Sequence, residues 1–424
     1  MSAWLDYEQA PPWWLPLSHM VTAPCWLLLG AGLLAALPAG QVQRFQPEVL
    51  ALTHLLTLGV LGNVMLGALW QLLAVAAAVP IRGPRWLLLS SYLPLQAGCA
   101  ALVTGFWQGL SPGWLQAGAA LLLPALLSPA LYGLHGLWRS PARDATSQGM
   151  RLALLSLLLT AVFGASMVLV LSGRLALPLP RLLDNHILWA AGGWLSLLIL
   201  AVARTVIPLF LITPAGQEKQ VSPERLLAGL IGLASVSMLL GLDSLSVAMV
   251  LAVCLSLCWA VLRLLHGLLH SKRPSDPSRR GWQSACLWLL VAIGGIVTLQ
   301  WRPADNILPV LSGWCVLAGF GLGAVLSMQG KILPFLVWLQ LKLAGLPRRQ
   351  LPATHDFLAE ASHAQLLQLH ALWMLCGLAW LAWGKSMPLA IATLLLGAYW
   401  LWLAARVLLR NQRCLRQLPL QTGS

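Results

Sequence analysis

The chain has 424 residues, of which 59% are hydrophobic and 9% are charged, and its mean hydropathy is +0.79. Soluble domains carry far more charged surface, so this composition excludes an ordinary soluble protein. The formal net charge of +14 does not indicate nucleic acid as a partner, because a soluble basic face with interleaved aromatic residues is missing. The composition predicts a polytopic protein that contacts the lipid bilayer.

Apolar runs of roughly 20 residues, the length that crosses a bilayer, recur along the whole chain. We expect an all-α bundle of about twelve transmembrane helices forming a single domain over residues 1–424, since a β-barrel would show short alternating segments instead. The expected spans cover residues 15–38, 48–78, 85–107, 113–137, 148–172, 183–213, 224–242, 245–270, 283–301, 307–340, 366–384 and 387–409.

The basic residues are divided unevenly between the two sides of this span map. Nineteen Lys and Arg residues fall on the side that holds both termini, five fall on the other side, and Arg204 and Lys331 fall inside spans. Short cytoplasmic loops carry an excess of Lys and Arg. The distribution therefore predicts that both termini are cytoplasmic.

The second, sixth and tenth spans are the longest on this map and share several features. Each carries glycines along its length and a proline toward its cytoplasmic end, at Pro80, Pro208 and Pro334. Glycines allow neighbouring helices or a flat cofactor to come close, and prolines leave carbonyls that need another donor. The pattern suggests a weak internal repeat of four spans.

His54 and His186 lie at matching depth near the outer ends of the second and sixth spans. An imidazole just inside a bilayer is costly unless it has a partner, and a heme iron is one such partner. We expect both histidines to bind a cofactor as ligands of a heme iron. The alternative is two interfacial histidines bonded to backbone or water.

Arg204 and Lys331 each stand three or four residues before a proline, and Gln71 and Gln329 are further polar residues of the same long spans. No Asp or Glu lies in a span interior, so an acid partner for the two cations is expected to be missing. Their side chains would then reach the interface or bond the carbonyls freed by proline. The alternative is a site for a small anion or a lipid headgroup.

His363 and His370 occur in the segment SHAQLLQLHALW near the inner end of the eleventh span. Their spacing of seven residues places both on one face of a helix. The spacing suggests that the two histidines line a polar path.

Three stretches carry a resemblance to a known family: THLLTLGVLGNVMLGALWQ, GGWLSLLILAVARTVIPLFLITP and GKILPFLVWLQL. With twelve spans, a histidine near the outer end of span two and a three-part repetition, the chain resembles the heme-copper oxidase subunit I superfamily, which includes cytochrome c oxidases and nitric oxide reductases. In that superfamily the span-two histidine ligates a low-spin heme, a role that the resemblance implies for His54. It also implies a multi-pass protein of a bacterial inner membrane.

The chain departs from that superfamily at the oxygen-reducing centre. Its tenth and seventh spans contain no histidine, so the heme-copper centre cannot be built in the usual way and no copper is expected. The expectation is a degenerate relative that binds one heme b for electron transfer or for handling or sensing nitric oxide or oxygen, with a redox partner or another membrane subunit. The sequence contains no complete set of catalytic residues, so it does not indicate an enzyme.

Two other functions stay open at this point. One is a small-anion permease that uses Arg204 and Lys331 at helix breaks. The other is a membrane subunit without a cofactor, whose task is assembly with a partner.

Overall fold

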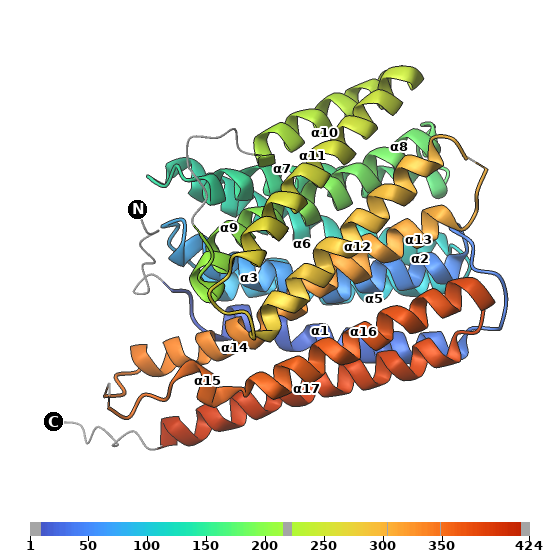
Figure 1. The fold of residues 1–424 in the computed structure, drawn as a ribbon. Coiled ribbons are helices and arrows are strands. Elements are labelled where there is room, and N and C mark those ends of the chain that lie inside the picture. Colours follow the sequence, from blue (N-terminus) through green and yellow to red (C-terminus); the bar gives the residue numbers. More distant parts are fainter. Residues whose placement is uncertain (1–9, 215–222, 303, 348, 417–424) are drawn as a thin grey trace.

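The computed structural model describes residues 10–214, 223–302, 304–347 and 349–416. Twelve helical spans in this part of the chain are long and apolar enough to cross a membrane, and no strand occurs among the described residues. The predicted all-α polytopic bundle is therefore confirmed. Figure 1 shows the spans lying side by side, with α10 (Pro223–Leu240) and α11 (Asp243–Leu269) along one edge and α16 (Glu360–Trp383) and α17 (Met387–Arg416) along the opposite edge.

Eight spans are single α-helices, and four combine α- and π-helical segments. The other single-helix spans are α1 (Trp14–Ala36), α6 (Pro112–Arg139), α7 (Ala145–Leu171) and α12 (Pro277–Leu299). Span two consists of α2 (Pro47–His54), η2 (Leu55–Gly62) and α3 (Asn63–Val75), and span three of α4 (Pro84–Leu87), η3 (Leu88–Tyr92) and α5 (Leu93–Trp107). Span six consists of α8 (Leu179–Ile187), η4 (Leu188–Leu197) and α9 (Leu198–Leu211), and span ten of α13 (Leu308–Trp314), η5 (Cys315–Leu322) and α14 (Gly323–Leu343). The short helix α15 (Thr354–Phe357) lies outside the spans.

Helix packing divides the bundle into three arcs of four spans. In the first arc α16 packs on α17, α17 on α1, and α1 on span two; in the second, spans three to six pack in chain order; in the third, spans seven to ten do so. Each arc thus ends in a long span with a π-helical segment, and η5 contacts both η2 and η4. Spans two, six and ten, each the last span of its arc, are the most enclosed of the twelve. This arrangement supports the repeat of four spans suggested by the sequence.

Each of these three π-helical segments has a glycine on which the preceding span of its arc packs. A Cβ atom added to Gly59, Gly193 or Gly319 would lie 2.7, 2.7 or 2.5 Å from a side chain of α1, α7 or α12. A π-helical turn also alters the carbonyl pattern of a helix, which then needs additional donors. Asn63 Nδ2 donates to the Gly59 carbonyl at 2.8 Å in span two. Ser196 Oγ donates to the Ala191 carbonyl at 2.7 Å in span six.

The observed spans follow the expected ones closely, with three differences. Spans nine and eleven begin at Pro277 and Glu360 instead of 283 and 366, and span twelve continues to Arg416 instead of 409. These helices extend through charged turns that lie beyond the apolar core of the bilayer, so hydropathy alone makes them too short. Span twelve, with 30 residues, is also longer than span two, with 29.

The two ends of the bundle differ in charge. We call the end at which α1 begins and α17 ends the basic end, and the opposite end the sparse end. Exposed tryptophans occur toward both ends, at Trp86 and Trp138 on the basic side and at Trp114, Trp301 and Trp383 on the sparse side. Tryptophan favours the boundary between lipid and water, so these side chains are consistent with a bilayer between the two ends.

Candidate functional site

His54 and His186 occupy equivalent places in two of the three arc-ending spans. His54 is the last residue of α2, directly before η2, and His186 lies one residue before the end of α8, directly followed by Ile187 and η4. Each is also the eighth residue of its span. In span ten the residue directly before η5 is Trp314, so the third span offers an indole where the other two offer an imidazole.

Backbone carbonyls hold one nitrogen of each imidazole. His54 Nδ1 lies 2.8 Å from the Leu50 carbonyl oxygen on its own helix. His186 Nδ1 lies 3.1 Å from the Thr160 carbonyl oxygen on α7. A carbonyl oxygen can only accept, so Nδ1 carries the proton in both rings and Nε2 carries the lone pair.

The two imidazoles lie close together in the structure. Their centroids are 6.5 Å apart and their planes are inclined by 25°. Both side chains are partly exposed, and within the described chain no hydrogen bond engages either Nε2. Two imidazoles that ligate one metal from opposite sides, each with a bond of about 2.0–2.1 Å, have centroids about 6 Å apart. The observed separation fits a metal shared by the two rings.

The number of available ligands fits a heme better than a bare structural metal ion. Among the described residues, no three His, Cys, Asp or Glu side chains gather into a metal-ligand group. A structural zinc ion needs four protein ligands. A heme iron brings four nitrogens of its own, so two histidines complete its coordination.

The space beside the pair is filled in part by Phe106, whose ring stacks on His54 at a centroid distance of 4.7 Å. A cavity of 190 Å³ lies between α1 and α5, and one of 50 Å³ lies inside the first arc; neither is lined by His54 or His186. Ligand pockets commonly measure about 300–1,000 Å³. Neither cavity reaches the pair or this size, so a heme held there would require side chains such as Phe106 to move.

Arg204 and Lys331 both have acid partners, so the expectation of missing acids is wrong. Arg204 Nε lies 2.7 Å from Glu224 Oε1, in the first turn of α10. Lys331 Nζ lies 2.7 Å from Asp276 Oδ2, and 4.0 Å from Glu360 Oε1. The carboxylates lie at the beginnings of neighbouring spans, outside any span interior, so a search of the span interiors does not find them.

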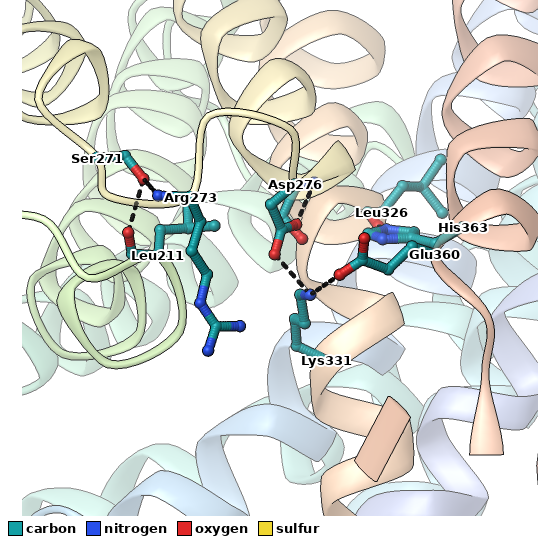
Figure 2. Close-up of polar contacts among 9 residues, drawn as sticks. Leu211, Ser271, Arg273, Asp276, Leu326, Lys331, Glu360 and His363 are labelled. Atoms are coloured by element: carbon teal, nitrogen blue, oxygen red, sulfur yellow. Dashed lines mark hydrogen bonds and ion pairs between the residues drawn. The ribbon is translucent and has the colours of Figure 1, made fainter. Parts of the chain in front are cut away.

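Figure 2 shows how the Lys331 cluster joins three elements at the basic end. Asp276 is the N-cap of α12 and accepts the Ser278 backbone N–H at 2.9 Å. Asp276 is 2% exposed, whereas Glu360 is 60% exposed. Burial by itself raises the pKa of Asp276, but the ion pair with Lys331 and the hydrogen bonds of Ser278 outweigh it and hold the pKa below its usual value.

These ion pairs remove the main argument for an anion site. The positive charge of Arg204 and that of Lys331 are each offset by a buried carboxylate. A small anion at either residue would meet that carboxylate as well as the cation, and like charges repel. The geometry favours a structural role, in which the Arg204 pair ties span six to span seven and the Lys331 pairs tie span ten to spans nine and eleven.

Gln71 and Gln329 are buried in spans two and ten. Both amide atoms of Gln71 and the Nε2 atom of Gln329 make no hydrogen bond within the described residues. No interaction in this part of the chain joins either glutamine to the histidine pair. Buried amides without partners of this kind are commonly satisfied by water.

His363 and His370 are also buried, and each donates to a carbonyl of span ten. His363 Nε2 lies 2.9 Å from the Leu326 oxygen, and His370 Nε2 lies 2.9 Å from the Ala318 oxygen of η5. The two histidines therefore face the same neighbouring span, as their spacing predicts.

Sequence reasoning missed a buried polar network between spans one, two and three. His19 Nδ1 lies 3.2 Å from Asn63 Oδ1, which also accepts Gln96 Nε2 at 2.8 Å. Trp26 Nε1 donates to Gln96 Oε1 at 2.7 Å. His19 is fully buried and its Nε2 has no partner among the described residues. The available signal was an imidazole and two amides in three consecutive apolar spans.

No protein-family model matches the chain, and the search of curated proteins finds no relative. Function therefore has to be argued from the geometry of the chain itself.

Proposed function

We propose that the chain is a membrane heme protein in which His54 and His186 would hold the iron of one b-type heme. The observation that carries the proposal is the meeting of two imidazoles from separate arcs, 6.5 Å apart. In both rings Nδ1 is bound to a backbone carbonyl and Nε2 is open.

The chain's own residues prepare the two ligands. The Leu50 and Thr160 carbonyls fix the tautomer with the proton on Nδ1 and make Nε2 a stronger donor to a metal. Phe106 covers one face of His54 and limits access of water. A heme held there would supply one-electron redox chemistry or the binding of a diatomic gas.

The fold supports a distant relationship to subunit I of the heme-copper oxidase superfamily. Twelve spans arranged as three arcs of four agree with the repetition on which that resemblance rests. We extend the proposal to a bacterial inner membrane with the basic end in the cytoplasm, following the distribution of Lys and Arg. The heme would then lie nearer the outer face, where a redox partner or a second membrane subunit could exchange electrons with it.

The direct test is absorption spectroscopy of protein purified in mild detergent from heme-replete cells, together with a pyridine hemochrome assay. The proposal expects a Soret band, a b-type hemochrome and about one heme per chain. Absence of heme under replete conditions would overturn it and leave a cofactor-free assembly subunit as the better explanation.

A further inference from the structure

The seam between α14 and α16 contains two histidines that face two glycines. His363 and His370 are seven residues apart on α16, and Gly323 and Gly330 are seven residues apart on α14. A Cβ atom added to Gly330 would lie 2.4 Å from the His363 ring, and one added to Gly323 would lie 3.3 Å from His370 Cε1. The absence of both side chains makes room for the two imidazoles.

In each imidazole of this seam, only one of the two nitrogens makes a hydrogen bond within the described residues. Nε2–H donates to the Leu326 carbonyl in His363 and to the Ala318 carbonyl in His370. Nδ1 is therefore the basic nitrogen, and no hydrogen bond within the described residues engages it in either ring. A neutral imidazole in this state can take up a proton at one nitrogen and release one from the other.

At the basic end of the bundle, charged groups connect the seam to solvent. Glu360 is 60% exposed, Lys331 is 15% exposed and Asp276 is 2% exposed, so the cluster leads from the surface inward. Figure 2 shows His363 beside Glu360, one turn further along α16. These three side chains are the charged groups that face His363, from α14, α12 and α16.

Polar groups continue the seam past His370 toward the sparse end. Ser327 lies between Gly323 and Gly330 on the same face of α14 and is fully buried, with its Oγ bonded to the Gly323 carbonyl at 2.6 Å. Beyond His370, Trp373 Nε1 donates to Thr393 Oγ1 at 2.8 Å. Trp373 and Thr393 line the 50 Å³ cavity, which exceeds the ~10–15 Å³ that one water requires.

We propose that this seam is a proton-exchange path, in which His363 and His370 carry protons between solvent at the basic end and the small cavity of the first arc. In each transfer a proton from water binds Nδ1, the Nε2–H bond breaks, and the Nε2 proton passes to a water further inward. The net charge of the imidazole is the same before and after. The path ends within the bundle, so it exchanges protons with the interior without crossing the membrane.

The test is exchange of histidine ring protons with D2O, followed by NMR on protein labelled with ¹⁵N in its imidazoles. His370 is assigned from its missing signal in His370→Gln, and His19 from its missing signal in His19→Gln. His19 is 0% exposed and His370 is 5% exposed, so both are buried, but His19 lies outside the seam. The proposal expects the His370 ring proton to exchange at least about tenfold faster than that of His19.

The deciding variant is His363→Gln. A glutamine amide still donates to the Leu326 carbonyl, so the structural bond is kept, but it cannot pass a proton from one nitrogen to another. The proposal expects His370 exchange to slow about tenfold or more while the melting temperature stays close to that of the parent protein. Unchanged His370 exchange in the variant would overturn the proposal, and so would His370 exchange as slow as that of His19 in the parent protein. Neither reading depends on whether heme is bound.

Discussion

The histidine pair toward the sparse end and the Lys331 cluster at the basic end are both polar sites in an apolar bundle, but they differ in how far their bonding capacity is used. At the Lys331 cluster each charge meets an opposite one, with Lys331 Nζ 2.7 Å from Asp276. At the histidine pair, one nitrogen of each ring is bonded and the other is open. Buried polar groups are normally satisfied, and the paired charges of the Lys331 cluster follow this rule, which indicates a structural role. The open nitrogens of the two partly exposed histidines are the feature on which the heme proposal rests.

The largest expected effect concerns the histidine pair. His54→Ala and His186→Ala each remove one axial ligand, and we expect either change to reduce heme content at least about tenfold or to convert the remaining heme to a five-coordinate state. Heme per chain measured by pyridine hemochrome checks this. His135→Ala, at an exposed histidine, is the matched control and is expected to retain full heme content. Equal loss in all three variants would contradict a specific role for the pair.

The next largest effect concerns the Lys331 cluster. Lys331→Met leaves the Asp276 carboxylate, 2% exposed, with only its cap hydrogen bonds. Loss of one partner of a buried ion pair costs about 3–5 kcal/mol, so the unfolding free energy in detergent should fall by about that amount. The double variant Lys331→Met with Asp276→Asn should recover part of the loss. A decrease in unfolding free energy below ~1 kcal/mol for Lys331→Met would contradict a stabilising role of this ion pair.

A smaller effect is expected at the second ion pair. The Arg204 side chain is 34% exposed, so solvent screens its interaction with Glu224. For Arg204→Gln we expect a loss of about 1–2 kcal/mol in the same denaturation assay. A loss as large as that of Lys331→Met would contradict the ranking of the two sites.

The smallest effect is a dependence of stability on acid pH. The pKa of Asp276 is held below its usual value in the folded chain, and the usual value is about 3.9 in an unfolded chain. The resulting stabilisation is present above about pH 4 and is lost as pH falls through the lower folded pKa. Asp276→Asn should flatten the unfolding free energy between about pH 4 and pH 2. An unchanged slope there would contradict the contribution of this carboxylate.

Hydropathy predicted the twelve spans because a bilayer demands about 20 apolar residues wherever the chain crosses it. It could not predict the π-helical segments, since residues such as Leu55–Gly62 are as apolar as any α-helical run. Hydropathy also failed to predict helix ends that lie in charged turns, such as the beginning of span eleven at Glu360. Those ends depend on caps and loops that lie outside the membrane.

The candidate site was predictable to the extent that position along a span determines depth. Matching places in spans two and six suggested that His54 and His186 belong together, and their rings do lie close to each other. The partners of Arg204 and Lys331 were not predictable in this way. Asp276 is 55 residues from Lys331 in sequence, and only the packing of α12 on α14 brings them together.

Electron paramagnetic resonance of the oxidised protein tests the central claim most directly, because it reports the axial ligands of a heme iron. The account predicts a low-spin signal of a six-coordinate heme with two imidazoles in the parent protein, and its replacement by a high-spin signal in His186→Ala. A low-spin signal that persists in both His54→Ala and His186→Ala, or a protein without heme under replete conditions, would contradict it.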